Sequence, residues 1–111
     1  MFTRKNINGY TDPLPGIKMK TIAWGEKTLM TEFLLSKGSV LPPHSHPHEQ
    51  TGYLVSGRIT LIIGDRTFDA LPGDCWCILS GVEHQALAHE DSVAVEVFSP
   101  LREEYLPPKN R

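Results

Sequence analysis

Glycine and proline interrupt this chain so often that few folds are open to it. The 111 residues include nine glycines and nine prolines, which fall between short apolar runs at fairly regular intervals. No segment of ten or more residues has a clean 3.6-residue period, so helix is limited to about one turn near residues 101–105. This pattern is typical of an all-β protein.

Eight strands are predicted from the apolar runs. They cover residues 18–23, 27–35, 50–55, 58–63, 66–70, 75–79, 84–88 and 93–98. Gly25-Glu26 and Gly64-Asp65 suit tight hairpins, because glycine adopts positive φ without cost. About eight short strands at this spacing can close into a barrel or a jelly roll, which protects the sheet edges and leaves room for one small ligand.

The chain length fits one domain, which buries about two thirds of its unfolded surface. We expect an irregular N-terminal arm over residues 1–17, the barrel over 18–106 and a C-terminal tail over 107–111. The arm holds two prolines and two glycines. Small barrels with such arms often dimerise by exchanging edge segments, so we expect a homodimer.

Charge and hydropathy exclude several classes of partner. The net charge is -2 and there is no basic stretch, so we expect no nucleic-acid partner. The apolar runs are far shorter than the roughly 20 residues of a membrane span, and we expect neither a membrane helix nor a secretory signal. Cys75 and Cys77 flank one residue and are expected to be reduced, which favours a cytoplasmic location.

Four of the five histidines form the most informative pattern. The four are His44, His46, His48 and His84. In an extended chain the first three lie on one face together with Gln50, whereas Glu49 lies on the other. Two imidazoles at i and i+2, an amide oxygen and a third imidazole from a distant strand form an N3O site for a divalent transition metal. The alternative is an exposed polar loop without a ligand.

The spacing around the histidines resembles the first motif of the cupin family. Gly38 is followed after five residues by His44, after one by His46, after three by Gln50 and after six by Gly57. Glutamine here occupies the position where the family most often has glutamate.

A second stretch is similar to the second cupin motif. Gly73 is followed after five residues by Leu79-Ser-Gly and then, after two more, by His84. Leu79 stands where proline is usual, and Ala88 stands where asparagine is usual. The two motifs together cover nearly half of the chain.

The resemblance implies a double-stranded β-helix, the cupin jelly-roll barrel, with one metal ion in its mouth. It implies His44, His46, Gln50 and His84 as ligands and leaves His48 outside the ligand set. Ni, Zn, Mn, Fe, Co and Cu all accept such ligands, so the ion is not specified. Because all four ligands are neutral, the ion would keep its full charge, which favours Lewis-acid chemistry over oxygen activation.

The last predicted strand alternates between an apolar and a mixed face. Its three valines, at positions 93, 95 and 97, share one face, and Ala94, Glu96 and Phe98 share the other. If the valines pack on a second layer or a partner, Glu96 looks into the barrel, where desolvation raises its pKa toward the range of a general acid or base. The opposite arrangement, with Glu96 in solvent, is equally compatible with alternation.

Residues 96–106 are similar to the ending of the small pectin-degradation cupins. Those proteins open the ring of 4,5-unsaturated monouronates released by pectate and alginate lyases. The resemblance implies catalytic roles for Glu96, Phe98 and Arg102, with glutamate where aspartate is usual. Arg102 has a second interpretation, as the salt-bridge partner of Glu103 or Glu104.

These features predict a metal-dependent cytoplasmic enzyme that opens the ring of an unsaturated sugar acid. Two alternatives stay open from the sequence. One is a non-catalytic cupin that binds a metal and a sugar, and the other is a metal-dependent dioxygenase.

Overall fold

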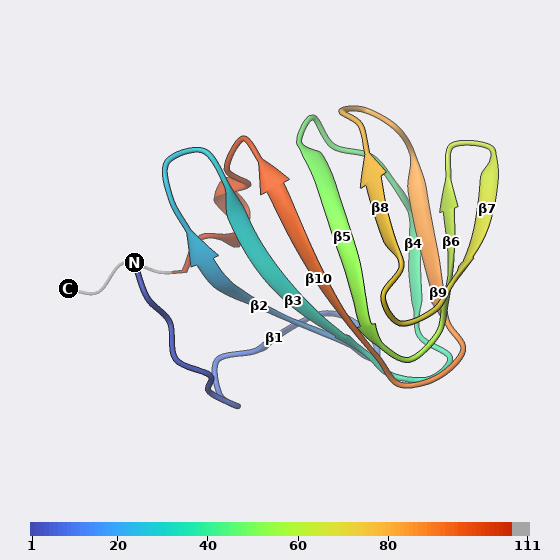
Figure 1. Cartoon of the computed structure of the whole chain (residues 1–111), viewed down its shortest axis with the longest axis horizontal. Coiled ribbons are helices and arrows are strands. Elements are labelled where there is room, and N and C mark those ends of the chain that lie inside the picture. The colour runs from blue at the N-terminus through green and yellow to red at the C-terminus, as the bar shows by residue number, and fades with distance from the viewer. Residues whose placement is uncertain (108–111) are drawn as a thin grey trace.

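The computed structural model describes residues 1–107 as an all-β barrel (Figure 1). Its elements are β1 (Thr11–Leu14), β2 (Ile17–Trp24), β3 (Leu29–Leu35), β4 (Val40–His44), β5 (Glu49–Ser56), β6 (Ile59–Ile63), β7 (Arg66–Ala70), β8 (Cys75–Ile78), β9 (His84–Ala88), β10 (Ser92–Ser99) and the 3-10 turn η1 (Glu103–Tyr105). The all-β prediction is therefore confirmed, and the expected helical turn is η1. Within the described residues no helix is long and apolar enough to cross a membrane.

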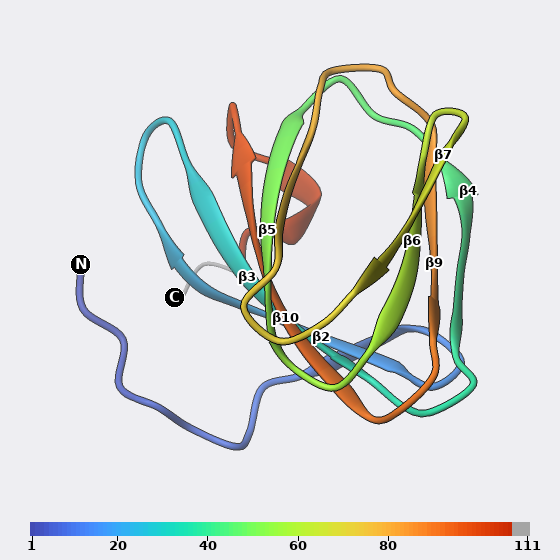
Figure 2. The same ribbon diagram turned by 45° about the vertical axis from the view of Figure 1, so that its right-hand side comes forward.

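Two antiparallel sheets face each other and enclose the core (Figure 2). The six-stranded sheet has the order β1-β2-β3-β10-β5-β8, and the four-stranded sheet has the order β4-β9-β6-β7. β10 lies between β3 and β5, so its inward side chains reach the centre of the barrel. Residues on β10 alternate between buried and half-buried, and the buried set includes Ala94, Glu96 and Phe98.

All eight predicted strands are present, with bounds shifted by two residues at most. Two further strands, β1 and β4, were not expected, because Pro13 interrupts the first and Pro42 and Pro43 interrupt the second. Both strands lie at a sheet edge, where the missing proline N–H is not needed for a second neighbour. β1 pairs with β2 inside the segment expected to be an irregular arm. Residues 108–111 of the expected tail lie outside the described part of the chain.

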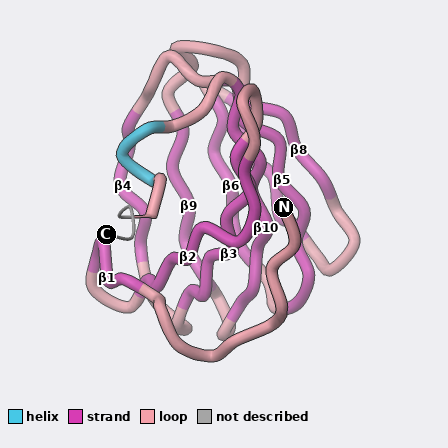
Figure 3. Tube along the Cα trace, turned by 90° about the vertical axis from the view of Figure 1, so that its left-hand side faces the viewer, coloured by secondary structure: helices cyan, strands magenta, loops and turns pink. Residues whose placement is uncertain are grey.

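The chain after β10 returns to the barrel wall through η1 (Figure 3). The carbonyl oxygen of Tyr105 accepts a hydrogen bond from the Thr21 hydroxyl on β2. The Tyr105 ring meets the Phe33 ring on β3 edge to face, with centroids 6.5 Å apart. These two contacts hold the C-terminal segment, including Arg102, beside the barrel interior.

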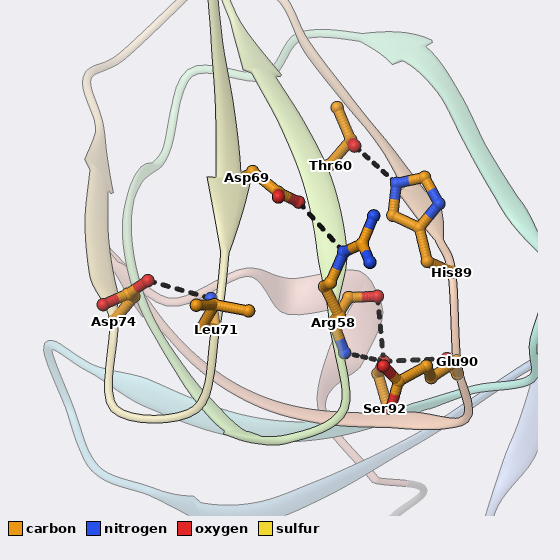
Figure 4. A network of polar contacts seen from close by, with 8 residues as sticks. All are labelled: Arg58, Thr60, Asp69, Leu71, Asp74, His89, Glu90 and Ser92. Atoms are coloured by element: carbon orange, nitrogen blue, oxygen red, sulfur yellow. Dashed lines mark hydrogen bonds and ion pairs between the residues drawn. The ribbon is translucent and has the colours of Figure 1, made fainter.

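A polar network fastens β6 to its neighbours away from the barrel interior (Figure 4). The Arg58 guanidinium contacts Asp69 on β7. The backbone N–H of Arg58 donates to the Ser92 hydroxyl. The Thr60 hydroxyl lies 2.6 Å from Nε2 of His89. His89, for which the sequence suggests no function, thus has a structural partner.

Candidate active site

Three histidine side chains meet inside the barrel. His44 ends β4 and His84 begins β9, and the two residues are directly paired across these strands. His46 comes from the loop between β4 and β5. One nitrogen from each ring lies within 4.8 Å of the others, a grouping that could hold a metal ion.

All three rings have the same tautomer. In each ring, Nδ1 lies 2.9 to 3.0 Å from the backbone carbonyl oxygen of a residue two positions away. The oxygen belongs to Pro42 for His44, to His48 for His46 and to Val82 for His84. Because a carbonyl only accepts, Nδ1 carries the proton and Nε2 keeps its lone pair. Backbone contacts of this kind orient metal-ligating histidines.

Burial keeps two of these imidazoles neutral. It lowers the pKa of His84 to about 4, and it also lowers the pKa of His46. Neutral imidazole is the form that binds a metal ion. The cluster therefore offers unprotonated nitrogens at neutral pH.

The Gln50 side chain completes the donor set. Its Nε2 donates to Glu96 at 2.9 Å, and its Oε1 faces Nε2 of His46 at 3.0 Å. Two lone pairs thus face each other without a hydrogen between them. Nε2 of His84 is also buried and has no hydrogen-bond partner among the described residues. A divalent cation would satisfy all of these acceptors, so the donor set fits a metal.

A buried carboxylate lies next to this cluster. Glu96 is 8 % exposed, and its Oε1 accepts hydrogen bonds from Nε2 of Gln50 and, at 3.0 Å, from Nε1 of Trp76. Burial raises the pKa of Glu96 to about 7, although the two hydrogen bonds act in the opposite direction. A carboxyl group with this pKa can both give and take a proton near neutral pH.

Arg102, Phe98 and Tyr105 line the same cavity as His44, His84 and Glu96. The guanidinium of Arg102 stacks over Tyr105 at 4.2 Å and over Phe98 at 5.1 Å from the ring centroids. Nε of Arg102 also contacts Glu104 at 3.2 Å, and the Arg102 side chain is only 13 % exposed. Arg102 thus pairs with Glu104, as its second interpretation predicts, and it also lines the cavity.

Comparison with known proteins decides the family. Residues 31–99 match the model of the Cupin domain. The chain belongs to the cupin family. It is 30 % identical over 93 residues to the pectin degradation protein KdgF of Dickeya dadantii strain 3937. The aligned residues cover 82 % of this chain and 84 % of that protein.

Solved structures agree with this assignment. KdgF from Halomonas sp. superposes on this cupin with a TM-score of 0.90 and 30 % identity, over 96 % of this chain and 98 % of that one. An RmlC-like cupin from Shewanella frigidimarina NCIMB 400 gives a TM-score of 0.89 over 95 % of both chains, and its 22 % identity supports the fold alone. The predicted family and the jelly-roll fold are confirmed.

The structure brings together the residues that the cupin motifs and the C-terminal ending single out. These are His44, His46, Gln50, His84, Glu96, Phe98 and Arg102. Glu96 and Phe98 face inward, which resolves the choice left open by strand alternation.

The alternation expected around the histidines is seen in their burial. Residues 45–48 form a loop between β4 and β5, yet positions 45, 47 and 49 are exposed, whereas His44, His46, His48 and Gln50 are buried or half-buried. His48 lies beside His46, with ring centroids 5.6 Å apart, but does not join the group of three. Glu49 is exposed, as expected. Cys75 and Cys77 are exposed free thiols and do not reach the cluster.

Two residues of the site were not anticipated from the sequence. The indole N–H of Trp76 donates a hydrogen bond to the Glu96 carboxylate. Tyr105 supplies the ring on which Arg102 stacks. Tyr105 lies within the C-terminal segment that resembles the pectin-degradation cupins, so a signal for it existed, whereas the contact of Trp76 depends on strand register.

Proposed function

We propose that this cupin is a metal-dependent enzyme that opens the ring of 4,5-unsaturated monouronic acids derived from pectin or alginate. The observation that carries the proposal is a buried carboxyl group, Glu96, that lies beside a group of three imidazoles and shares a cavity with His44, His84 and Arg102. The similarity to proteins named KdgF supports the substrate class.

The chemistry of the substrate matches these side chains. An unsaturated monouronate is an enol ether with a carboxylate on C5. Addition of water places a proton on C4 and a hydroxyl on C5, and the resulting hemiketal opens to the linear keto acid. The reaction needs a proton donor and acceptor, a group that binds the carboxylate, and polarisation of an oxygen.

His44, His46, Gln50 and His84 would hold one divalent transition metal ion, such as Ni, Zn, Mn, Fe, Co or Cu. When bound, such an ion supplies Lewis-acid polarisation of a sugar or water oxygen. The three backbone carbonyls at Nδ1 keep the imidazoles oriented toward one point.

Glu96 would transfer the proton. Its raised pKa means that a substantial fraction of the protein carries the protonated acid near neutral pH. The Phe98 ring is 1 % exposed and packs beside His46, with centroids 5.7 Å apart, so it closes the cavity floor under the sugar ring.

Arg102 would bind the uronate carboxylate. Its Nε contacts Glu104, and the stacking of its guanidinium on Tyr105 and Phe98 fixes the plane of the group. A planar fork can bind a carboxylate through two parallel hydrogen bonds, which a lysine ammonium cannot reproduce.

Replacement of Arg102 by lysine should therefore weaken substrate binding more than turnover. We expect KM to rise about 10-fold, with a smaller change in kcat, because the charge stays while the fork is lost. Steady-state kinetics on the unsaturated uronate measure this effect. Arg58→Lys is the matched control, since Arg58 pairs with Asp69 in the network of Figure 4. An unchanged KM for Arg102→Lys would remove Arg102 from substrate binding.

The function itself is tested by the ultraviolet absorbance of the substrate double bond. We expect metal-loaded protein to accelerate the loss of absorbance of a lyase-generated uronate, and a chelator to stop the acceleration. No acceleration by metal-replete protein would contradict ring opening. Metal-dependent binding of the uronate without turnover would then favour the non-catalytic cupin, and oxygen consumption would favour the dioxygenase.

We also propose that the chain is a homodimer acting in the cytoplasm. The free thiols Cys75 and Cys77 fit a reducing compartment. Phe2 and Ile7 of the N-terminal segment are exposed, as are Met30 and Tyr53 on the outer face of the six-stranded sheet. Light scattering should give twice the 12.4 kDa chain mass, and Met30→Glu should shift the mass toward the monomer. A monomeric wild type would contradict the dimer.

A further inference from the structure

We propose that Trp76 is a positioning residue that fixes the Glu96 carboxylate, and that this arrangement leaves Oε2 of Glu96 as the atom that carries the transferred proton. The catalytic part of this inference rests on the proposed function. The positioning part rests on the register of three strands.

Trp76, Gly52 and Glu96 form one row across the inner face of the six-stranded sheet. Gly52 on β5 is paired directly with Trp76 on β8 and with Glu96 on β10. Trp76 and Glu96 are therefore separated by the width of one strand. Their side chains nevertheless meet, with Nε1 of Trp76 at 3.0 Å from Oε1 of Glu96.

Gly52 makes this meeting possible because it has no side chain. A Cβ atom at position 52 would lie 2.1 Å from Nε1 of Trp76 and 2.4 Å from Oε1 of Glu96. Both distances are far shorter than any van der Waals contact, so any other residue at position 52 would displace the indole, the carboxylate or both. The indole and the carboxylate thus occupy the space above β5 that a side chain would normally fill.

Both hydrogen bonds to the Glu96 carboxylate end on the same oxygen. Nε2 of Gln50 and Nε1 of Trp76 both donate to Oε1, and no described side chain donates to Oε2. An oxygen that accepts two N–H donors is a poor site for a proton. The protonated acid therefore carries its hydrogen on Oε2.

This row also accounts for the length of the Glu96 side chain, at a position where aspartate is usual in similar proteins. The additional methylene carries the carboxylate over Gly52 as far as the indole of Trp76. Glu96→Asp would draw the carboxylate back from Trp76 and Gln50, and both hydrogen bonds to Oε1 would lengthen.

The hydrogen bond is tested directly by NMR. Trp24 and Trp76 are the two tryptophans of the sequence, so the spectrum of the labelled full chain with Zn²⁺ contains two indole N–H resonances. In Glu96→Ala the Trp76 resonance should move upfield, since its acceptor is lost, whereas that of the exposed Trp24 should stay in place. An unmoved Trp76 resonance would overturn the proposal.

Kinetics test the consequence for the reaction. Trp76→Phe keeps the ring and removes the N–H donor, and we expect kcat to fall about 10- to 100-fold while KM and metal content stay near the wild-type values. Trp24→Phe is the matched control. Unchanged kcat in Trp76→Phe would overturn the positioning role, and so would a loss that appears only in KM.

Gly52→Ala offers a second variant from the same row. It should lower kcat at least as much as Trp76→Phe, whereas Gly25→Ala, where a Cβ would meet nothing within 4 Å, should be neutral. Because the NMR measurement needs no substrate, it decides the Trp76 hydrogen bond even for a wild type that leaves the uronate unchanged. That last result would contradict the proposed function and not the position of the carboxylate.

Discussion

Glu96→Gln should abolish ring opening while the protein keeps its bound metal. The amide oxygen of a glutamine can accept the hydrogen bonds from Gln50 and Trp76 that Oε1 of Glu96 accepts now. The side chain therefore keeps its shape and its position. What it loses is the exchangeable proton, and removal of a general acid or base slows a reaction by about 10² to 10⁴.

Two measurements on the same preparation separate chemistry from assembly. The rate comes from the absorbance of the uronate double bond, and the metal content comes from elemental analysis after gel filtration. Glu49→Gln is the control, because Glu49 is the exposed neighbour of Gln50 at the start of β5. Turnover by Glu96→Gln near the wild-type rate would exclude Glu96 as the proton carrier. Loss of metal in that variant would instead assign it a structural part in the metal centre.

The strands were predictable from the sequence where alternation and turn residues agree. β7 follows this rule, since Gly64-Asp65 precedes it, Pro72-Gly73-Asp74 follows it, and Phe68 and Ala70 alternate with polar residues. β6 and β9 are bounded by similar turns but each carries three consecutive apolar residues. β1 and β4 could not be predicted in the same way, because proline argues against a strand unless its place at a sheet edge is known. Edge position is a property of the complete sheet and is not encoded in the local segment.

The grouping of three histidines was predictable from spacing, since His44, His46 and His84 lie in the two segments that resemble the cupin motifs. The hydrogen-bond partners of Glu96 could not be predicted in this way. Trp76 lies 20 residues before Glu96, and their contact arises from a register in which Gly52 stands between them. A lone glycine within a strand indicates a close approach of something to the backbone, but it does not indicate what approaches.

The way the C-terminal segment is held also lay beyond the sequence. Arg102 had two interpretations from the sequence, and in the structure its Nε contacts Glu104 while its guanidinium stacks on Tyr105 beside the cavity. η1 is held by contacts of Tyr105 with Thr21 on β2 and with Phe33 on β3, two residues that lie far away in the sequence. Contacts between residues far apart in the sequence place the C-terminal segment, and they thereby decide that Arg102 pairs with Glu104.

His84→Ala should remove the metal and, with it, the thermal stabilisation that metal provides. His84 is 2 % exposed, and its buried Nε2 has no hydrogen-bond partner among residues 1–107, which costs folding free energy. Binding an ion relieves this cost in the folded state only. At a free-metal concentration of 100 times Kd, linkage gives about 2.7 kcal/mol, which corresponds to a Tm increase of about 10 °C or more for a domain of this size.

Thermal unfolding with and without added Zn²⁺ or Ni²⁺ measures this effect, and elemental analysis measures the ion. We expect the wild type to gain stability, and His84→Ala to show little gain and an affinity lowered by more than about 100-fold. His89→Ala is the matched control, because His89 follows the same strand, β9, and contacts Thr60 away from the cluster. Equal metal content in His84→Ala and wild type would contradict the ligand set. The alanine variant also lacks the buried nitrogen that has no partner. Without metal, it should therefore lose no more thermal stability than the cavity left by the missing imidazole accounts for.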